Sequence, residues 1–377
     1  MRLTRYLMLL LAVVVLLTGC FDQAGRNDGP ASEPVLKVDE NSEENSQESY
    51  SNENANNKQG EYTVLAEHLR IPWAISFFGD DVYISERGGT IVQVDSEGNL
   101  IRKQVQVEKY VFSTGEAGLL GFVLTPDFET SREAYAYHTY RESGRVLNRI
   151  IRLKEQDEAW VETEVLLDAV PGGNVHDGGR LAIGPDGHLY ATTGDAWDRS
   201  LSQDLNSLAG KILRMTLNGK VPEDNPFDNS YVYSYGHRNP QGITWNDDDD
   251  LYSSEHGPNA HDEINQIKPG SNYGWPDVFG DNQLEDAVPP LFHTGQSTIA
   301  PSGIAFGTEG KLLIAALRGE GLYEYDPQSG TIETVLEGEG RFRDVKIHNG
   351  QIYVITNNTD GRGSPSATDD RLLLLKQ

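Results

Sequence analysis

The fold is decided by a short pattern that runs Gly179-Arg180-Leu181-Ala182-Ile183, then Pro185-Asp186-Gly187, then Leu189-Tyr190-Ala191. Its two apolar segments alternate like β-strands, and the Pro-Asp-Gly between them is typical of a tight turn. Five further copies have first strands at 73–77, 120–124, 241–245, 302–306 and 343–347, and second strands at 82–84, 134–137, 251–253, 312–314 and 352–354. The chain is therefore a repeat of one hairpin unit.

Third strands follow most copies, as at 90–94, 211–215 and 321–325. Six units of three to four strands predict an all-β fold, a six-bladed β-propeller of four-stranded blades, over residues 61–377. The strands 62–65 and 371–375 belong to no unit. We expect them to share the last blade and so to close the ring.

The first twenty residues have the pattern of an export signal. Arg2 and Arg5 precede an apolar run over 6–17, which is too short for a comfortable membrane span. The run ends in Leu17-Thr18-Gly19-Cys20, which resembles a bacterial lipobox, and Cys20 is the only cysteine in the chain. We therefore predict a lipoprotein signal peptide over 1–20 and an extracytoplasmic protein that is lipid-anchored to the cell membrane through Cys20.

Residues 21–60 carry nine acidic and three basic residues and almost no aromatic ones. Such a segment buries too little apolar surface to order itself, so we predict a disordered acidic linker. The whole chain has a formal net charge of −27. A field of this sign repels nucleic acid, which excludes a nucleic-acid partner, and an anionic ligand would need a local basic cluster.

Charged and amide side chains stand at the starts of the first strands, where a propeller blade reaches one mouth of the central channel. They are Glu116 at the second unit, His176 and Arg180 at the third, Arg238 and Gln241 at the fourth, and Arg341 and Arg343 at the sixth. Because equivalent repeat positions converge in space, these residues predict one pocket.

His176 and Asp195 form the most informative pair. Either residue alone has a structural explanation, as a hydrogen-bonding loop histidine or as an aspartate that closes a turn. However, adjacent strands of one blade bring both to the same edge. A carboxylate beside an imidazole orients its tautomer and raises its basicity, which favours a general base.

Two further groups leave their alternatives open. Arg318, Arg341 and Arg343 could pair with surface acids, or could form a clamp for carboxylates or phosphates, and the pattern favours neither. Gly257-Pro258 could be an ordinary turn. Beside Arg238, however, its backbone carbonyls could instead serve as calcium ligands.

Several motifs, in order along residues 61–377, are similar to those of the soluble quinoprotein glucose/sorbosone dehydrogenase family, and of its aldose sugar dehydrogenase branch in particular. They are His176-Asp177-Gly178-Gly179-Arg180-Leu181, Thr193-Gly194-Asp195, Gly236-His237-Arg238-Asn239-Pro240-Gln241-Gly242, Gly257-Pro258-Asn259, Asp262-Glu263-Ile264-Asn265 and Asn272-Tyr273-Gly274-Trp275-Pro276. The resemblance implies a propeller that binds pyrroloquinoline quinone (PQQ) and calcium. It also implies oxidation of the anomeric hydroxyl of aldoses to lactones by His-assisted hydride transfer to the quinone, with an electron acceptor that the sequence does not identify.

The resemblance also implies roles for single residues. His176 is the catalytic base, Asp195 is its partner, and Arg238 polarises the quinone carbonyl. Cofactor contacts are implied for Glu116, Arg238, Asn239, Gln241, Arg318, Arg341 and Arg343, calcium ligation by the carbonyls of Gly257 and Pro258, and a further calcium site for Glu263 and Tyr273. Glu116 and His256 each stand where the glucose enzyme has glutamine.

Two other functions fit a propeller. One is a calcium-dependent lactonase-type hydrolase, which places carboxylates and amides around a channel ion and has no need for three arginines. The other is a non-catalytic propeller that binds sugars or proteins, for which a His–Asp pair at the channel mouth has no use.

Overall fold

A computed structural model describes residues 61–376, so the predicted signal peptide at 1–20 and linker at 21–60 lie outside the described residues. The helical segments within 61–376 are one turn of α-helix, α1 (Phe128–Ser131), and two 3-10 turns, η1 (Arg199–Ser202) and η2 (Thr308–Gly310). In this range no helix has the length and apolar character needed to cross a membrane. The prediction of an all-β fold is confirmed.

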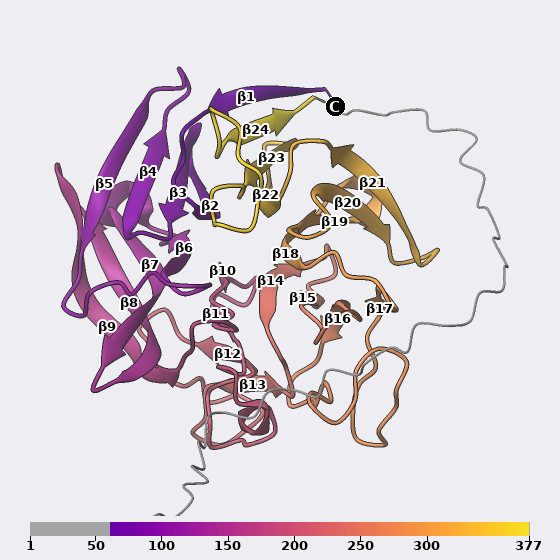
Figure 1. The fold of residues 1–377 in the computed structure, drawn as a ribbon. Helices are drawn as coiled ribbons and strands as arrows, with labels where there is room; N and C mark the ends of the chain where they lie inside the picture. Colours follow the sequence, from indigo (N-terminus) through magenta and orange to yellow (C-terminus); the bar gives the residue numbers. More distant parts are fainter. Residues whose placement is uncertain (1–60, 377) are drawn as a thin grey trace, which may run out of the picture. The chain divides into compact units, whose positions relative to one another are not determined.

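Four of the sheets have four antiparallel strands each, and all the sheets are arranged around a common centre as in a β-propeller (Figure 1). In spatial order the strands of these four sheets are β10 (Leu181–Ile183), β11 (Leu189–Thr193), β12 (Lys211–Met215) and β13 (Val232–Tyr235); β14 (Pro240–Trp245), β15 (Leu251–Glu255), β16 (Glu263–Ile267) and β17 (Phe292–His293); β18 (Pro301–Phe306), β19 (Leu312–Ala316), β20 (Gly321–Asp326) and β21 (Thr331–Glu337); and β22 (Phe342–His348), β23 (Gln351–Thr356), β24 (Leu372–Leu375) and β1 (Tyr62–Ala66).

The fifth sheet has eight strands and was not expected from the repeat. Its order is β2 (Pro72–Phe78), β3 (Asp81–Glu86), β4 (Thr90–Val94), β5 (Leu100–Gln106), β9 (Ala159–Pro171), β8 (Arg145–Glu155), β7 (Glu133–Glu142) and β6 (Leu119–Leu124). Each half is an antiparallel group of four strands, and the halves are joined by parallel pairing of β5 with β9. This pairing satisfies backbone groups that two outer edge strands would otherwise leave open.

The two ends of the described chain share one sheet, as the sequence predicts. β1 pairs antiparallel with β24, with Tyr62 opposite Leu375, and β24 pairs with β23 on its other side. The first strand of the domain thus completes a sheet built by the last three, which closes the ring (Figure 1).

Apolar side chains fill the spaces between neighbouring sheets. Ile264 of β16, for example, belongs to one buried cluster with Ile304 and Ile314 of the next sheet. A polar contact also joins two sheets. Arg180, just before β10, forms a fully buried ion pair with Asp344 of β22 at 2.9 Å. Arg180, a candidate for the pocket by its repeat position, therefore links two sheets and does not line the cavity described below.

Candidate active site

A cavity of about 220 Å³ lies where the ends of several strands meet. It is lined by Glu116, His176, Arg238, His256, Gly257, Pro258, Asn259, Asp262, Thr298, Ala300, Leu317, Arg318, Arg341 and Arg362. All of these residues lie in connections next to strands, and the connections of all five sheets contribute. Glu116, His176, Arg238 and Arg341 therefore lie around one cavity, as their equivalent repeat positions predicted.

His176 and Asp195 are in direct contact at the edge of this cavity. The imidazole Nδ1 lies 2.7 Å from Asp195 Oδ1, and both residues are buried. Within residues 61–376, no side chain or backbone group hydrogen-bonds to Nε2 of His176. A carboxylate on Nδ1 fixes the neutral tautomer whose Nε2 carries the lone pair, so Nε2 can accept a proton from a group in the cavity.

Asp195 is held on both of its oxygens. Oδ1 also accepts a hydrogen bond from the backbone N–H of Trp197 at 2.9 Å, and Oδ2 accepts one from the indole Nε1 of Trp275 at 2.9 Å. These contacts fix the carboxylate that orients His176. Trp275 lies in one of the motifs noted in the sequence, but only the fold shows that it reaches across 80 positions to Asp195.

Arg238 enters the cavity from the start of β14. Its Nη1 donates to the carbonyl of His256 at 3.2 Å, its Nη2 lies 3.5 Å from the carbonyl oxygen of Pro258, and its buried Nε has no hydrogen-bond partner among the described residues. Burial lowers the pKa of Arg238, although the carboxylates of Asp195 and Glu255 oppose this effect. An arginine stays protonated under such a shift, so the cavity contains a fixed positive charge.

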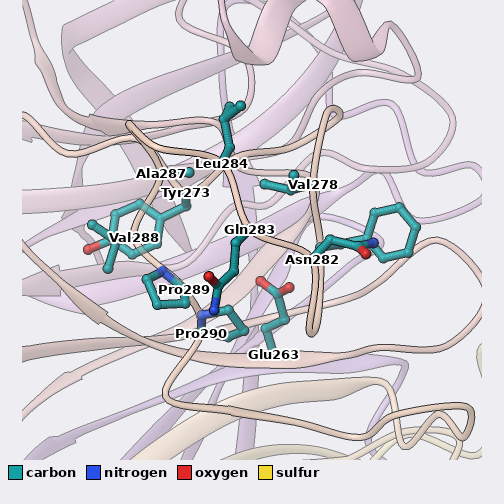
Figure 2. A pocket seen from close by; sticks show the side chains of 11 residues that line it. Glu263, Tyr273, Val278, Asn282, Gln283, Leu284, Ala287, Val288, Pro289 and Pro290 are labelled. Carbon is teal, nitrogen blue, oxygen red and sulfur yellow. The ribbon is translucent and has the colours of Figure 1, made fainter.

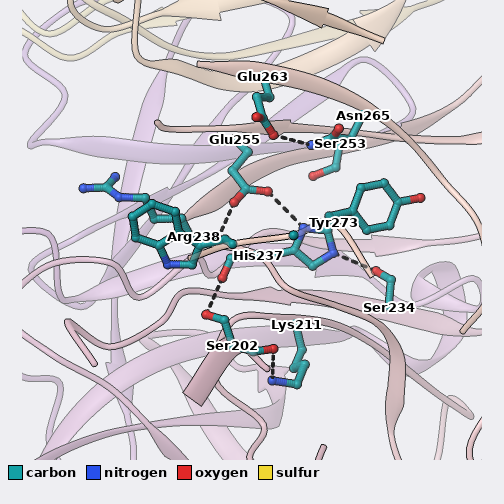
Figure 3. A network of polar contacts seen from close by, with 12 residues as sticks. Ser202, Lys211, Ser234, His237, Arg238, Ser253, Glu255, Glu263, Asn265 and Tyr273 are labelled. Atoms are coloured by element: carbon teal, nitrogen blue, oxygen red, sulfur yellow. Dashed lines mark hydrogen bonds and ion pairs between the residues drawn. The ribbon is translucent and has the colours of Figure 1, made fainter. Parts of the chain in front are cut away.

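A buried network behind the cavity fixes the backbone of Arg238 (Figure 3). The carboxylate of Glu255 accepts hydrogen bonds from the Arg238 N–H and from His237 Nδ1, the latter at 2.9 Å. His237 Nε2 lies 2.8 Å from the hydroxyl of Ser234. Ser, His and Glu here stand in the order of a catalytic triad, but all three are buried, so the network positions Arg238 and has no access to a substrate.

The predicted arginine group is only partly exposed to the cavity. Arg318 and Arg341 line it, and Arg341 is paired with Asp360 at 3.1 Å. Arg343 lies behind the lining, where it donates to Gln241 at 2.7 Å and to Asn357 at 2.9 Å. Burial lowers the pKa of Arg343 to about 9.

Glu116 joins three parts of the site. Its carboxylate accepts a hydrogen bond from the backbone N–H of His176 at 3.1 Å and from Asn239 Nδ2 at 3.3 Å, and it forms an ion pair with Arg362 at 3.0 Å. Burial favours the neutral acid, but the charges of His256 and Arg362 prevail and lower the pKa of Glu116 to about 2. His256 carries its charge only in acid, because burial lowers the pKa of His256 to about 4, so Arg362 is the partner of Glu116 at neutral pH. Asn239 lies behind Glu116 and does not line the cavity.

Sequence reasoning missed Arg362, which lies in the connection between β23 and β24. It belongs to no repeat position, and 246 positions separate it from Glu116. Arg362 explains how this chain accommodates an acid at position 116, because the negative charge of Glu116 is paired.

The loop of the predicted calcium ligands is tightly constrained. Asp262 accepts hydrogen bonds from the backbone N–H groups of Gly257, Ile299 and Ala300, at 2.9, 2.8 and 2.8 Å. A Cβ at Gly257 would stand 1.9 Å from the carbonyl oxygen of Ala260, so only glycine fits there. Gly257 and Pro258 both line the cavity, and carbonyl oxygens are hard ligands of the kind calcium takes. The residues present fit a calcium ion.

Glu263 and Tyr273, predicted for a further calcium site, line a separate cavity of about 150 Å³ (Figure 2). Burial and the neighbouring carboxylate of Glu255 raise the pKa of Glu263 to about 7. The Tyr273 hydroxyl donates to Gln266 O at 2.7 Å and accepts from Lys268 N at 2.8 Å. No group of three His, Cys, Asp or Glu side chains suited to a metal occurs in residues 61–376.

The main cavity also fits an anionic cofactor. The buried Nε atoms of Arg238, Arg341 and Arg343 have no hydrogen-bond partner within the described chain. Guanidinium groups match carboxylates in geometry. Those of Arg238 and Arg341, together with Arg318, surround a space into which a carboxylate could enter.

Known proteins are similar to this chain over most of residues 61–376. A family model described as Glucose / Sorbosone dehydrogenase matches residues 69–374. The aldose sugar dehydrogenase of Escherichia coli is 32% identical over 79% of this chain and 90% of its own length. Quinoprotein glucose dehydrogenase B of Acinetobacter calcoaceticus is 34% identical over 58% of this chain, and the match covers 52% of that protein, about half its length.

A solved structure of an aldose sugar dehydrogenase is also similar to this chain. The PQQ-bound aldose sugar dehydrogenase of Streptomyces coelicolor aligns with a TM-score of 0.78 and 40% identity, over 85% of this chain and 98% of that one.

Proposed function

Because the chain belongs to the glucose/sorbosone dehydrogenase family, we propose that it is a quinoprotein aldose sugar dehydrogenase that uses PQQ and calcium. The observation that carries this proposal is the His176–Asp195 pair, at 2.7 Å, beside a cavity lined by Arg238, Arg318 and Arg341. The relatives named as aldose sugar dehydrogenases, one of them with PQQ bound, support the choice of substrate class and cofactor.

The cavity arginines would hold the cofactor. PQQ is a tricarboxylate that supplies, when bound, a quinone able to take up a hydride from the sugar. Arg238, Arg318 and Arg341 line the cavity and would bind its anionic groups. Asn239, Gln241 and Arg343 would support them from behind, since Asn239 donates to Glu116 and Gln241 accepts from Arg343.

His176 would act as the general base. Its Nδ1 is occupied by Asp195, so Nε2 is the atom that takes the proton from the anomeric hydroxyl. Asp195 stabilises the imidazolium that forms, and the two tryptophan contacts of Asp195 keep the pair aligned. The fixed positive charge of Arg238 would stabilise negative charge that develops nearby, which is usually a large catalytic contribution.

The carbonyl oxygens of Gly257 and Pro258 would hold the calcium ion beside Arg238. We also propose a further calcium site at Glu263 and Tyr273, which line one cavity. A lactonase-type hydrolase would have no need for the three arginines that line the cavity, Arg238, Arg318 and Arg341.

Two further parts of the proposal concern the whole chain. Counting each half of the eight-stranded sheet as one blade gives a six-bladed propeller with four strands per blade. Cys20 would carry the lipid that anchors the protein outside the cytoplasm. Cys20→Ala should release the protein from the membrane fraction, and persistence in that fraction would contradict the anchor.

Reconstitution tests the function. Purified apoprotein is mixed with PQQ and calcium, and reduction of an artificial dye is followed with a panel of aldoses. We expect aldose-dependent dye reduction that requires both additions. No dye reduction with any aldose, together with no change in the quinone absorbance on mixing, would overturn the proposal.

A further inference from the structure

An exposed tryptophan stands beside the proposed base. Trp197 is 70% exposed, although a side chain of this size is normally largely buried. Its ring centre lies 5.0 Å from that of His176, with an angle of 54° between the ring planes. The indole therefore packs against the imidazole of the proposed base, although Trp197 is not among the residues that line the cavity, and most of its surface is exposed.

The backbone holds this indole in place at a conformational cost. Ala196 and Trp197 have φ values of 55° and 67°, the left-handed region that residues with a side chain rarely adopt. Three hydrogen bonds secure this turn: Trp197 N–H to Asp195 Oδ1 at 2.9 Å, Ala196 N–H to His176 O at 3.2 Å, and Asp198 N–H to Asp195 O at 2.9 Å. Strain of this kind persists where the surroundings enforce it, and it concentrates at functional sites.

The same carboxylate thus anchors the base and the backbone that carries the indole. Asp195 Oδ1 accepts from His176 Nδ1 and from the Trp197 N–H, so the base and the indole have one common reference point. If the indole served only to pack against His176, most of its surface would be buried. Its 70% exposure leaves a large aromatic surface free for a ligand.

We propose that Trp197 is a stacking residue for the pyranose ring of the aldose. This inference rests on the proposed function and names a residue that binds the substrate. The C–H groups on one face of a pyranose are apolar and carry slight positive charge, so they match the negative face of an indole. A neutral sugar needs no basic partner, which suits a rigid aromatic surface on an acidic protein. Stacking there would hold the anomeric hydroxyl near His176 Nε2.

The test compares Trp197→Ala and Trp197→Phe with Tyr110→Ala. Tyr110 is 87% exposed, so its removal controls for the loss of an exposed aromatic side chain. In reconstituted holoenzyme we expect Trp197→Ala to raise the KM for aldose about tenfold, which corresponds to about 1.4 kcal/mol. Trp197→Phe should raise it less. The kcat at saturating sugar and the Kd for PQQ should change less than about twofold, and Tyr110→Ala should match wild type.

Three results would overturn the inference. The first is an unchanged KM for aldose in Trp197→Ala. The second is a rise confined to the KM for the electron acceptor, which would make Trp197 a docking residue for the acceptor. The third is a loss of PQQ binding in both Trp197 variants. Saturation-transfer NMR of glucose with the wild type and Trp197→Ala gives a second measure that needs no turnover. Transfer that is strong in wild type and weak in the variant supports stacking even if no dye is reduced, and equal transfer contradicts it.

Discussion

Two buried histidine–carboxylate pairs among residues 61–376 differ in whether the second ring nitrogen is accessible. His176 meets Asp195 at 2.7 Å, and His237 meets Glu255 at 2.9 Å. The Nε2 of His176 is not hydrogen-bonded within the described chain and its ring lines the cavity, whereas the Nε2 of His237 lies 2.8 Å from Ser234 in the core. The comparison shows that the pair alone does not define a base. Access for the second nitrogen decides whether the pair can act on a substrate.

A third histidine shows what the carboxylate contributes. His138 is fully buried, hydrogen-bonds only to the carbonyl of Thr139 at 3.2 Å, and has no partner at Nε2 within residues 61–376. Burial lowers the pKa of His138 to about 4, and the charge of Arg149 adds to this effect. Without a bonded carboxylate, a buried imidazole stays neutral and inert.

Replacing His176, the histidine whose Nε2 is accessible, should have the largest effect on catalysis. His176→Asn removes the group that accepts the proton and leaves the cavity arginines in place. We expect kcat for aldose oxidation to fall about 10³-fold, within the range for loss of a general base. The Kd for PQQ, measured by fluorescence quenching of the apoprotein, should change less than about threefold. An equal loss of turnover and of PQQ affinity would show that His176 binds the cofactor and does not act as the base.

Replacing Asp195, the partner of His176, should have the next largest effect on catalysis. Asp195→Asn keeps the shape of the side chain but removes the charge that stabilises the imidazolium. We expect kcat to fall about 10²-fold, with part of the activity regained at higher pH, where deprotonation of the sugar is easier. A kcat equal to that of the wild type across the pH profile would contradict a role for Asp195 in catalysis.

Replacing His237, which pairs with Glu255 in the core, should affect stability more than catalysis. His237→Gln leaves Glu255 and Ser234 without their partner in the core, which should lower the free energy of unfolding by about 3 kcal/mol. Turnover per folded, PQQ-loaded molecule should fall only a fewfold, through looser placement of Arg238. Urea unfolding and kinetics on the same preparation measure both quantities. A loss of kcat as large as that of His176→Asn, with unchanged stability, would reverse the assignment of the two pairs.

The isolated histidine should give the smallest effect, and only in acid. Between about pH 6.5 and pH 4 the unfolded chain binds a proton at His138 that the folded protein does not bind, so stability falls as the pH falls through this window. His138→Leu lacks this proton uptake. From pH 7 to pH 4.5 we expect the wild type to lose about 2 kcal/mol more stability than the variant, as measured by urea unfolding. Parallel losses in both proteins would show that His138 is not responsible.

The fold and part of the site could be predicted from the sequence for one physical reason. Equivalent positions of a repeat converge in a ring, so the repeat alone indicates that Glu116, His176, Arg238 and Arg341 lie together. The closure by β1 and β24 followed from two strands that belong to no unit. The parallel pairing of β5 with β9 could not be predicted, because it joins edge strands of different units and has no periodic signal.

The remaining residues of the site lie in connections without a repeat. Arg362, Trp197 and Trp275 act through contacts that depend on loop conformation, and no spacing rule indicates them. In contrast, Gln241 and Arg343 have the expected repeat positions but turn toward each other behind the cavity. A repeat position thus indicates which strand end a residue occupies, and the hydrogen bonds of its neighbours decide which way its side chain points.

Chemical modification of the wild-type protein tests the central comparison most directly. The folded apoprotein is treated with diethyl pyrocarbonate, and acylation at each histidine is followed by mass spectrometry, with and without PQQ and calcium. We predict that His176 is acylated in the apoprotein and protected by the two additions, while His237 reacts only after unfolding. Acylation of His237 as fast as that of His176, or acylation of His176 that PQQ and calcium do not slow, would contradict the account.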